Sequence, residues 1–294
     1  MVRPRALRRP CDTLPEVYLT RHEAPEGPRW ALDGRFLAGQ ADLRFLLAPP
    51  KAALSDLLRG IVGSGEATGR LLPPLEPTSE VWAAGVTYSR SREAREAESA
   101  VKDVYSRVYE AERPELFFKA VGWRVAGHRM PIRVRDDSGW NVPEPELTLV
   151  VNTHGEIVGF CAGNDVSSRD IEGENPLYLP QAKVYDGSCA LGPGIALADA
   201  NSLADVAIRL AVLRDGREIF RGETSTSRIK RPLEELVRYL RKELAFPDGV
   251  FLMTGTGIVP PHDFSLQRGD LVRVEVGSLT LENEVDRQLR VTEQ

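Results

Sequence analysis

Several features that mark common protein classes are scarce or missing in this sequence of 294 residues. It has only three cysteines, Cys11, Cys161 and Cys189, and no CxxC pair. This argues against a disulfide framework or a structural zinc site, and it predicts a reducing, cytoplasmic environment. No apolar run is long enough to span a bilayer, and the arginine-rich N-terminus lacks the apolar stretch of a signal peptide. We therefore expect no association with a membrane.

The charge balance gives no sign of a basic binding surface. Lysine and arginine number 38 against 43 aspartates and glutamates, a formal net charge of −5. Nucleic-acid binding usually needs a basic patch, so we expect no nucleic-acid partner. Hydrophobic residues make up 42% and charged residues 28%, as in ordinary globular proteins. The length suggests one large domain, or a small domain plus a larger one.

Residues 1–76 are expected to form a small N-terminal α/β domain. A strand near 17–19, a hairpin at Asp33-Gly34 and a helix with apolar residues at helical spacing over 52–61 are its signals. Prolines then indicate a linker, because proline can neither donate to a strand ladder nor extend a helix. These prolines are Pro73, Pro74 and Pro77.

Residues 77–294 are expected to form a second domain in which hairpins dominate. A helix should follow Pro232, and βαβ units are scarce, so we predict an α+β fold that is mainly β, with an antiparallel or mixed core. The predicted strands are 147–151, 157–161, 206–212, 219–220, 271–276 and 279–281. The predicted buried stripe of the helix is Leu233, Leu236, Val237, Leu240 and Leu244.

One long helical element is expected at the start of this domain, over residues 91–112. Its second half carries an apolar stripe, Val101, Val104, Tyr105 and Val108. Its first half is almost entirely charged residues and alanine. That half is either a solvated helix face or a mobile lid over a site.

Three carboxylates form the most informative pattern. Glu144 and Glu146 flank Pro145, and side chains two apart on a strand point to the same face. The prolines around them fit an edge or irregular strand. Asp165 lies just past the return strand of the predicted hairpin and can reach the same place. Such carboxylates repel one another unless a cation or proton lies between them, and they suit a hard cation such as Mg²⁺. Alone, however, Glu-x-Glu is usually a solvated face.

Polar residues nearby favour a site. Lys119 and Lys183 occur among apolar or aromatic residues, and lysine is seldom fully buried unless it is paired. Each could neutralise the carboxylates or bind a substrate carboxylate. The turn at 254–257 could hold an anion with its hydroxyls and backbone N–H groups, or it is a plain turn.

These residues together resemble the fumarylacetoacetate hydrolase superfamily from about Val81 onward. The matching stretches are Gly85-Val86-Thr87-Tyr88, Phe117-Phe118-Lys119, Glu144-Pro145-Glu146, 164–170, Lys183 with Gly192-Pro193, and Thr254-Gly255-Thr256. The resemblance implies a mixed β-roll catalytic domain, a homodimer or homotetramer, and Mg²⁺, Mn²⁺ or Ca²⁺ on the three carboxylates. It makes Lys183 an active-site lysine. The side chains expected to bind substrate are Tyr88, Ser91, Phe117, Lys119, Arg169 and Thr256.

One departure from the family pattern bears on the reaction. Hydrolase members usually carry Asn-Tyr-x-x-His, whose histidine activates water, whereas this chain has Thr87 and Ser91 at those two positions. Serine cannot replace that base near neutral pH. Of the four histidines, only His128 is expected near the site, and a structural role is expected for it.

The stretches 113–119 and 174–181 are similar to a dehydratase branch of the family. This similarity implies a hydro-lyase that converts a 2-keto-3-deoxy sugar acid of the arabinonate or xylonate type to 2-oxoglutarate semialdehyde. Glu115 matches the acid/base of that branch, and its role and that of Lys183 stay open. The alternatives are a hydrolase or decarboxylase of acylpyruvate-like 2-oxo acids, and a non-catalytic binding protein. Turnover of an acylpyruvate would favour the first, and metal binding without turnover the second.

Overall fold

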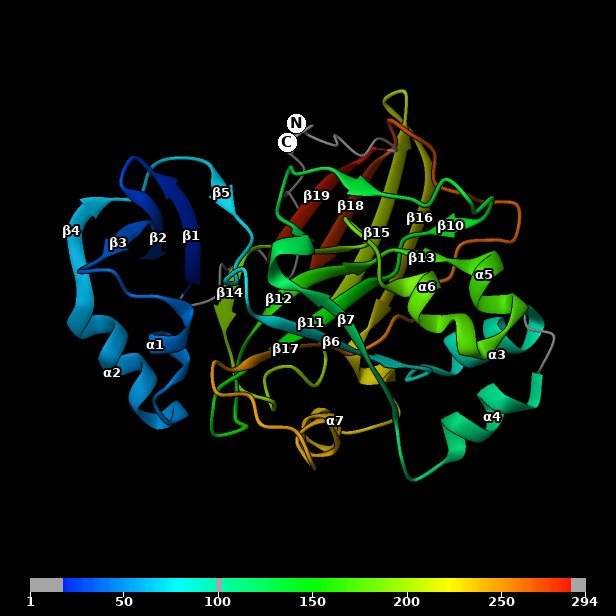
Figure 1. The fold of residues 1–294 in the computed structure, drawn as a ribbon, viewed down its shortest axis with the longest axis horizontal. Coiled ribbons are helices and arrows are strands. Elements are labelled where there is room, and N and C mark those ends of the chain that lie inside the picture. Colours follow the sequence, from blue (N-terminus) through cyan, green and yellow to red (C-terminus); the bar gives the residue numbers. More distant parts are fainter. Residues whose placement is uncertain (1–17, 99–101, 287–294) are drawn as a thin grey trace, which may run out of the picture.

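The computed structural model describes residues 18–98 and 102–286, and strands dominate it (Figure 1). Cys11 and the N-terminal arginines lie outside these residues. The described strands form a twelve-stranded mixed sheet, a five-stranded sheet and a two-stranded sheet. The expected α+β fold that is mainly β is therefore confirmed. Within the two described ranges, no helix is both long and apolar enough to cross a bilayer.

The N-terminal elements lie on one side of the molecule, blue in Figure 1. The hairpin expected at Asp33-Gly34 joins β2 to β3, and both turn residues have positive φ, 48° and 78°, as a type I′ turn requires. The expected helix is α2. The elements are β1 (Tyr18–Ala24), β2 (Gly27–Leu32), β3 (Arg35–Leu37), α1 (Leu43–Leu47), α2 (Lys51–Ile61), β4 (Val62–Glu66) and β5 (Leu71–Leu72).

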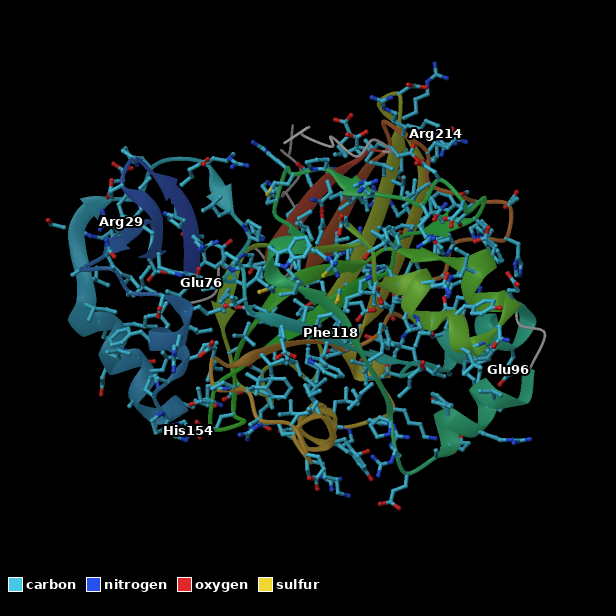
Figure 2. The ribbon with its side chains drawn as sticks, in the orientation of Figure 1. Arg29, Glu76, Glu96, Phe118, His154 and Arg214 are labelled. Carbon is cyan, nitrogen blue, oxygen red and sulfur yellow. The ribbon has the colours of Figure 1, made fainter. Side chains whose placement is uncertain are left out.

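Glu76, in the proline-rich linker, forms hydrogen bonds with residues of this N-terminal unit. Its carboxylate accepts hydrogen bonds from Arg21 Nη2 at 2.6 Å and Trp30 Nε1 at 2.9 Å. Figure 2 labels Glu76 beside the blue N-terminal elements. The sheet itself continues into the main body, because β1 pairs with β14 through Tyr18 and Leu19. A domain boundary near residue 76 stays a prediction.

The large sheet carries the strands that later form the site. Its order is β4-β3-β2-β1-β14-β12-β11-β17-β6-β7. The predicted hairpin is confirmed as β11 and β12, which pair antiparallel, whereas β17 and β6 pair parallel although they are far apart in the chain. The bounds are β6 (Glu80–Gly85), β7 (Glu115–Val121), β8 (Val125–Ala126), β11 (Pro145–Val151), β12 (Ile157–Asp165), β14 (Cys189–Leu197) and β17 (Val250–Met253).

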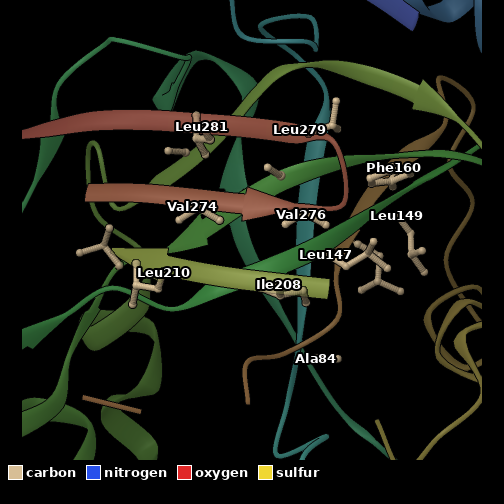
Figure 3. Close-up of a cluster of buried hydrophobic side chains, with 14 of the residues drawn as sticks. Ala84, Leu147, Leu149, Phe160, Ile208, Leu210, Val274, Val276, Leu279 and Leu281 are labelled. Atoms are coloured by element: carbon tan, nitrogen blue, oxygen red, sulfur yellow. The ribbon is translucent and has the colours of Figure 1, made fainter. Parts of the chain in front are cut away.

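The five-stranded sheet packs its apolar face against the large one. Leu147 and Phe160 from the large sheet meet Ile208, Val274 and Leu281 from the other in one buried cluster (Figure 3). The predicted hairpin at Asp215-Gly216 and the two late strands are confirmed. The bounds are β9 (Ile132–Arg133), β15 (Ala207–Arg214), β16 (Arg217–Ser225), β18 (Leu271–Val276) and β19 (Leu279–Asp286); β10 (Asn141–Val142) pairs with β13 (Ser167–Ser168).

Two expectations about helices are wrong. The segment 91–112 is not one helix, because α3 (Ser89–Glu98) and α4 (Lys102–Glu110) pack against each other; Val101 lies outside the described residues. Helix α7 (Leu233–Leu240) ends before Leu244, whose side chain is 43% exposed. The chain turns at Arg241, so the spacing of Leu244 from Leu240 is coincidental.

Short helices surround the carboxyl end of β12. The chain runs from β13 through α5 (Arg169–Glu174), η2 (Pro176–Tyr178) and α6 (Leu179–Lys183), which lie beside α3 and α4 in Figure 1. The other short helices are η1 (Gly122–Arg124) and η3 (Thr226–Arg228).

Candidate active site

The hairpin of β11 and β12 brings the three carboxylates together. Pro145 pairs with Asn164 at the open end of the hairpin, and the Asp165 backbone N–H donates to the Glu144 carbonyl oxygen at 2.9 Å. One carboxylate oxygen from each of Glu144, Glu146 and Asp165 lies within 4.8 Å of the other two. All three side chains are buried, so the alternative of a solvated face is excluded.

The proline at the start of β11 is tolerated because the strand has only one neighbour there. Strand β11 lies inside the sheet, but its pairing with β17 begins only at Thr148. Beyond β17 the chain turns away, and the Gly255 N–H donates to Glu146 Oε2 at 2.6 Å. Strand β11 is therefore unpaired on one side only near the carboxylates. This unpaired side leaves room for a site there.

Three buried cations contact two of these carboxylates. Lys183 Nζ donates to Glu144 Oε2 at 2.7 Å, to Asp165 Oδ2 at 3.1 Å and to Ser167 Oγ at 2.6 Å. Lys119 Nζ lies 2.5 Å from Asp165 Oδ1. Arg169 Nη2 lies 2.7 Å from Glu144 Oε1. Buried charges are expected to be paired in this way.

Glu146 differs from its neighbours because no salt bridge to it is found among the described residues. Burial raises its pKa well above the ordinary value, and the nearby charges of Asp165 and Glu144 raise it further. A buried carboxylate that faces two others favours a proton or a cation in the space between them. The donor set, three carboxylate oxygens, is the set that Mg²⁺ and Ca²⁺ prefer. The residues therefore fit a divalent cation.

A pocket opens at the triad, and Glu144, Glu146 and Asp165 line it. The expected residues Ser91, Phe117 and Thr256 line it, together with Glu115 and Lys183. Elements that are distant in the chain thus converge here: the end of β6, the start of α3, the start of β7, α6 and the loop after β17.

The other expected substrate contacts, Tyr88, Lys119 and Arg169, do not line the pocket. Lys119 and Arg169 instead contact the carboxylates of Asp165 and Glu144. Tyr88 is 1% exposed and packs against Gly257, where an added Cβ would lie 2.6 Å from its ring. Its hydroxyl has no hydrogen-bond partner among the described residues, and burial raises its pKa above the usual range.

His128 does not line the pocket, and its Nδ1 accepts a hydrogen bond from the Glu282 backbone N–H at 3.2 Å. It connects the loop after β8 to strand β19. The structural role expected for His128 agrees with this contact.

Sequence reasoning missed Glu172, Tyr105 and Leu179 as pocket residues. Glu172 is buried on α5, and its Oε2 lies 3.3 Å from Arg169 Nη1. The i,i+3 spacing of Arg169 and Glu172 was the available signal, but only the tertiary position of α5 shows which way the pair points.

The backbone strain at Val86 was also missed from the sequence. Its φ of 52° is unusual for a β-branched side chain, and it lies at the pocket.

Gly85 makes room for the carboxylate of Glu115. The two residues pair directly across β6 and β7, and a Cβ on Gly85 would lie 2.1 Å from Glu115 Oε2. The far end of a flexible side chain can move, so Gly85→Ala is expected to fold but to displace this carboxylate. Because an acid/base role is predicted for Glu115, we expect a fall in kcat of about 10²-fold, as small misplacements of reacting groups can cause. Steady-state kinetics of Gly85→Ala, alone and combined with Glu115→Gln, would test this. A further loss in the double variant would show that Gly85 acts through another group.

Comparisons with known proteins agree with this geometry. The family model of the fumarylacetoacetate hydrolase C-terminal domain matches residues 80–286. A 2-dehydro-3-deoxy-D-arabinonate dehydratase of Saccharolobus solfataricus is 42% identical over 229 residues, 76% of each chain. A probable 2-keto-3-deoxyxylonate dehydratase of Haloferax volcanii is 48% identical over 208 residues, 70% of this chain and 72% of its own.

A solved structure agrees as well. It is described as 2-keto-3-deoxy-D-arabinonate dehydratase complexed with magnesium and 2,5-dioxopentanoate, and it is 34% identical with a TM-score of 0.78. The alignment covers 93% of this chain and 100% of that chain. The likeness extends through the N-terminal unit as well as the part that the family model matches.

Proposed function

This chain belongs to the fumarylacetoacetate hydrolase family, and we propose that it is a metal-dependent dehydratase of 2-keto-3-deoxy pentonates. Its product would be 2,5-dioxopentanoate, the semialdehyde of 2-oxoglutarate. The main observation behind this proposal is that Glu115 enters the pocket that the metal-binding triad lines, while Ser91 stands where the hydrolases carry histidine. The pocket thus has a carboxylate suited to proton transfer.

The metal would be held by Glu144, Glu146 and Asp165. When bound, a divalent cation such as Mg²⁺, with Mn²⁺ and Ca²⁺ as alternatives, polarises the 2-oxo group and acidifies the neighbouring C3–H bond. The triad is buried, and one carboxylate oxygen of each residue lies within 4.8 Å of the other two, close enough to share one ion.

Lys183 acts in this proposal as a fixed cation rather than as a base. Three acceptors, Glu144, Asp165 and Ser167, surround its ammonium group. An ammonium group held in this way is fixed in place, and its positive charge stabilises negative charge that develops on the 2-oxo oxygen.

Glu115 then carries the proton. It takes a proton from C3 of the substrate and gives it to the hydroxyl group on C4, which leaves as water. The C3–H and C4–O bonds break, and a C3=C4 double bond forms. The double bond then moves to C4=C5 as C5 loses a proton and C3 gains one. The resulting enol becomes the aldehyde of 2,5-dioxopentanoate.

The direct test is turnover of 2-keto-3-deoxy-D-arabinonate by purified protein that was stripped with a chelator and then given Mg²⁺. A dehydrogenase specific for the semialdehyde would report the product. Metal-dependent product formation is expected. Pyruvate released from an acylpyruvate, with no sugar-acid turnover, would support the hydrolase instead, and metal binding without turnover of either would support a binding protein.

Two further proposals concern the state of the protein. We propose a homodimer or homotetramer, the assembly that the resemblance to the fumarylacetoacetate hydrolase family implies. We propose a cytoplasmic location because Cys161 and Cys189 are buried free thiols.

A further inference from the structure

A single peptide group connects the side chain of Thr87 to the carboxylate of Glu146. The Thr87 hydroxyl donates a hydrogen bond from Oγ1 to the Thr254 carbonyl oxygen at 2.6 Å. The N–H of the same peptide group belongs to Gly255, and it donates to Glu146 Oε2 at 2.6 Å. Thr87, Thr254 and Glu146 are all buried. A side chain two residues after β6 thus reaches a carboxylate of β11 through one planar unit.

Glu146 depends on this peptide group more than its neighbours do. In residues 18–98 and 102–286, the Gly255 N–H is the one hydrogen-bond donor found for the Glu146 carboxylate. The other two carboxylates of the triad are instead contacted by cations, Asp165 by Lys119 and Glu144 by Arg169. The direction of the Gly255 N–H therefore sets how the Glu146 carboxylate is oriented.

The peptide group is held from both of its ends. Thr254 is attached to β11, because its backbone N–H and its Oγ1 both donate to the Leu147 carbonyl oxygen, at 3.1 Å and 2.9 Å. Thr87 holds the carbonyl oxygen. Because a peptide group is planar, a fixed carbonyl oxygen also fixes the N–H on the opposite side. A hydrogen bond accepted at the carbonyl also strengthens the N–H as a donor.

The chain is shaped so that the hydroxyl can approach this closely. Gly255 has a φ of 88°, and a Cβ there would lie 2.1 Å from Thr87 Oγ1, so a side chain at this position would displace the hydroxyl. Val86, the strained residue at the pocket, directly precedes Thr87, and the Lys230 backbone N–H donates to the Thr87 carbonyl oxygen at 3.0 Å. Strained backbone persists where the surrounding structure fixes it, often at functional sites.

We propose that Thr87 is a positioning residue for Glu146. Its hydroxyl keeps the peptide group of Thr254 and Gly255 turned so that the N–H faces the carboxylate, which holds Glu146 in the orientation that binds a divalent cation. Thr87 does not line the pocket, so it acts on the ion only through this peptide group. The inference deepens the proposed function, because it takes Glu146 as a metal ligand.

The test measures Mg²⁺ affinity by isothermal titration of metal-stripped protein. Thr87→Val keeps the shape of the side chain but removes the donor, so the buried Thr254 carbonyl loses its hydroxyl partner and the peptide group turns to find another. Loss of groups that orient metal ligands costs 10-fold to 100-fold in affinity, and we expect Mg²⁺ to bind about tenfold more weakly. Thr87→Ser keeps the hydroxyl and should restore wild-type affinity.

Thr226→Val is the matched control. Thr226 is also buried, and its hydroxyl also donates to a backbone carbonyl, that of Leu203 at 2.7 Å, but it does not line the pocket. The control should lower Tm and leave the Mg²⁺ affinity unchanged. Thr87→Ala also lacks the hydroxyl and is too small to clash, so it takes the place of Thr87→Val if that variant does not fold.

A double-mutant cycle shows whether Thr87 acts through Glu146. In the background of Glu146→Gln, the further change Thr87→Val should weaken Mg²⁺ binding by less than about twofold, because the carboxylate that it orients is already gone. An equal loss of affinity in both backgrounds would overturn the inference, since a general loosening of the fold would produce it.

Wild-type Mg²⁺ affinity in a folded Thr87→Val or Thr87→Ala would also overturn the inference. So would a folded Thr87→Ser that binds Mg²⁺ about tenfold more weakly than the wild type, because its donor is intact. The proposed function can fail separately. The expected affinities without turnover of the sugar acid would contradict only the dehydratase, whereas an active dehydratase whose Thr87→Val variant binds Mg²⁺ normally would contradict only the role of Thr87.

Discussion

Glu146→Gln is expected to lose metal-dependent turnover and, without metal, to be more stable than the wild-type protein. Glutamine keeps the shape of the side chain and can still accept the hydrogen bond from the Gly255 N–H. It removes one of three mutually repelling charges, so the divalent cation loses a ligand. Loss of groups that merely orient metal ligands costs 10-fold to 100-fold. We therefore expect turnover at limiting Mg²⁺ to fall by at least about 10²-fold.

The same mutation is expected to raise the stability of the metal-free protein although it lowers turnover, because the pKa of Glu146 is raised in the folded protein. A carboxyl group whose pKa is higher in the folded protein adds stability at pH values below its ordinary pKa of 4.5. That contribution is lost as the pH rises through the raised pKa. Glutamine resembles a protonated glutamate and does not ionise, so the variant keeps this contribution to stability at every pH. At neutral pH the metal-free variant should therefore have the higher Tm.

Thermal melts with and without Mg²⁺ test the expected change in stability, and turnover assays test the expected loss of activity. Wild-type protein should gain stability from Mg²⁺, since a ligand that binds only the folded state stabilises it, and Glu146→Gln should gain little. Glu234→Gln, an exposed position at the start of α7, is the control for loss of a carboxylate. A variant that keeps the full Mg²⁺-induced shift would show that Glu146 is not a ligand.

Much of the metal-binding geometry could be predicted from the sequence because it is local. Glu144 directly precedes β11 and Glu146 lies within it, so the period of two of an extended chain places both side chains on one side. The turn after Val151 is short, so β12 returns antiparallel and Asp165 ends beside Glu144. Burial of Lys119 and Lys183 was predictable because apolar residues surround each of them in the sequence.

The far wall of the pocket could not be predicted because it depends on contacts between distant segments. Tyr105 comes from α4, Glu172 from α5 and Leu179 from α6. The position of each of these helices beside the sheet depends on contacts between segments that are distant in the chain, for which the sequence pattern holds no signal. The apolar stripe over residues 91–112 was visible, but helical periodicity does not show where one helix ends and a second folds back.

Glu115→Gln is expected to lower kcat by about 10²-fold to 10⁴-fold, the usual contribution of general acid–base catalysis, without weakening the metal site. Glu115 lines the pocket, and it is not one of the three carboxylates that cluster within 4.8 Å. Loss of its charge should therefore leave the affinity for Mg²⁺ and the binding of 2-oxopentanoate unchanged. That separates a defect in proton transfer from a defect in binding.

Hydrogen exchange at C3 shows which proton transfer depends on Glu115. 2-Oxopentanoate has the acidic C3–H bonds but no hydroxyl group on C4, so in D₂O it can exchange its C3 protons but cannot lose water. Wild-type protein with Mg²⁺ should catalyse this exchange, measured by NMR, and Glu115→Gln should not. If the variant exchanged C3 protons at the wild-type rate but failed to dehydrate the sugar acid, Glu115 would serve only as the acid for the departing hydroxyl. The base would then have to be another pocket group, and the interpretation of Lys183 as a fixed cation, which rests on its three acceptors, would need its own test.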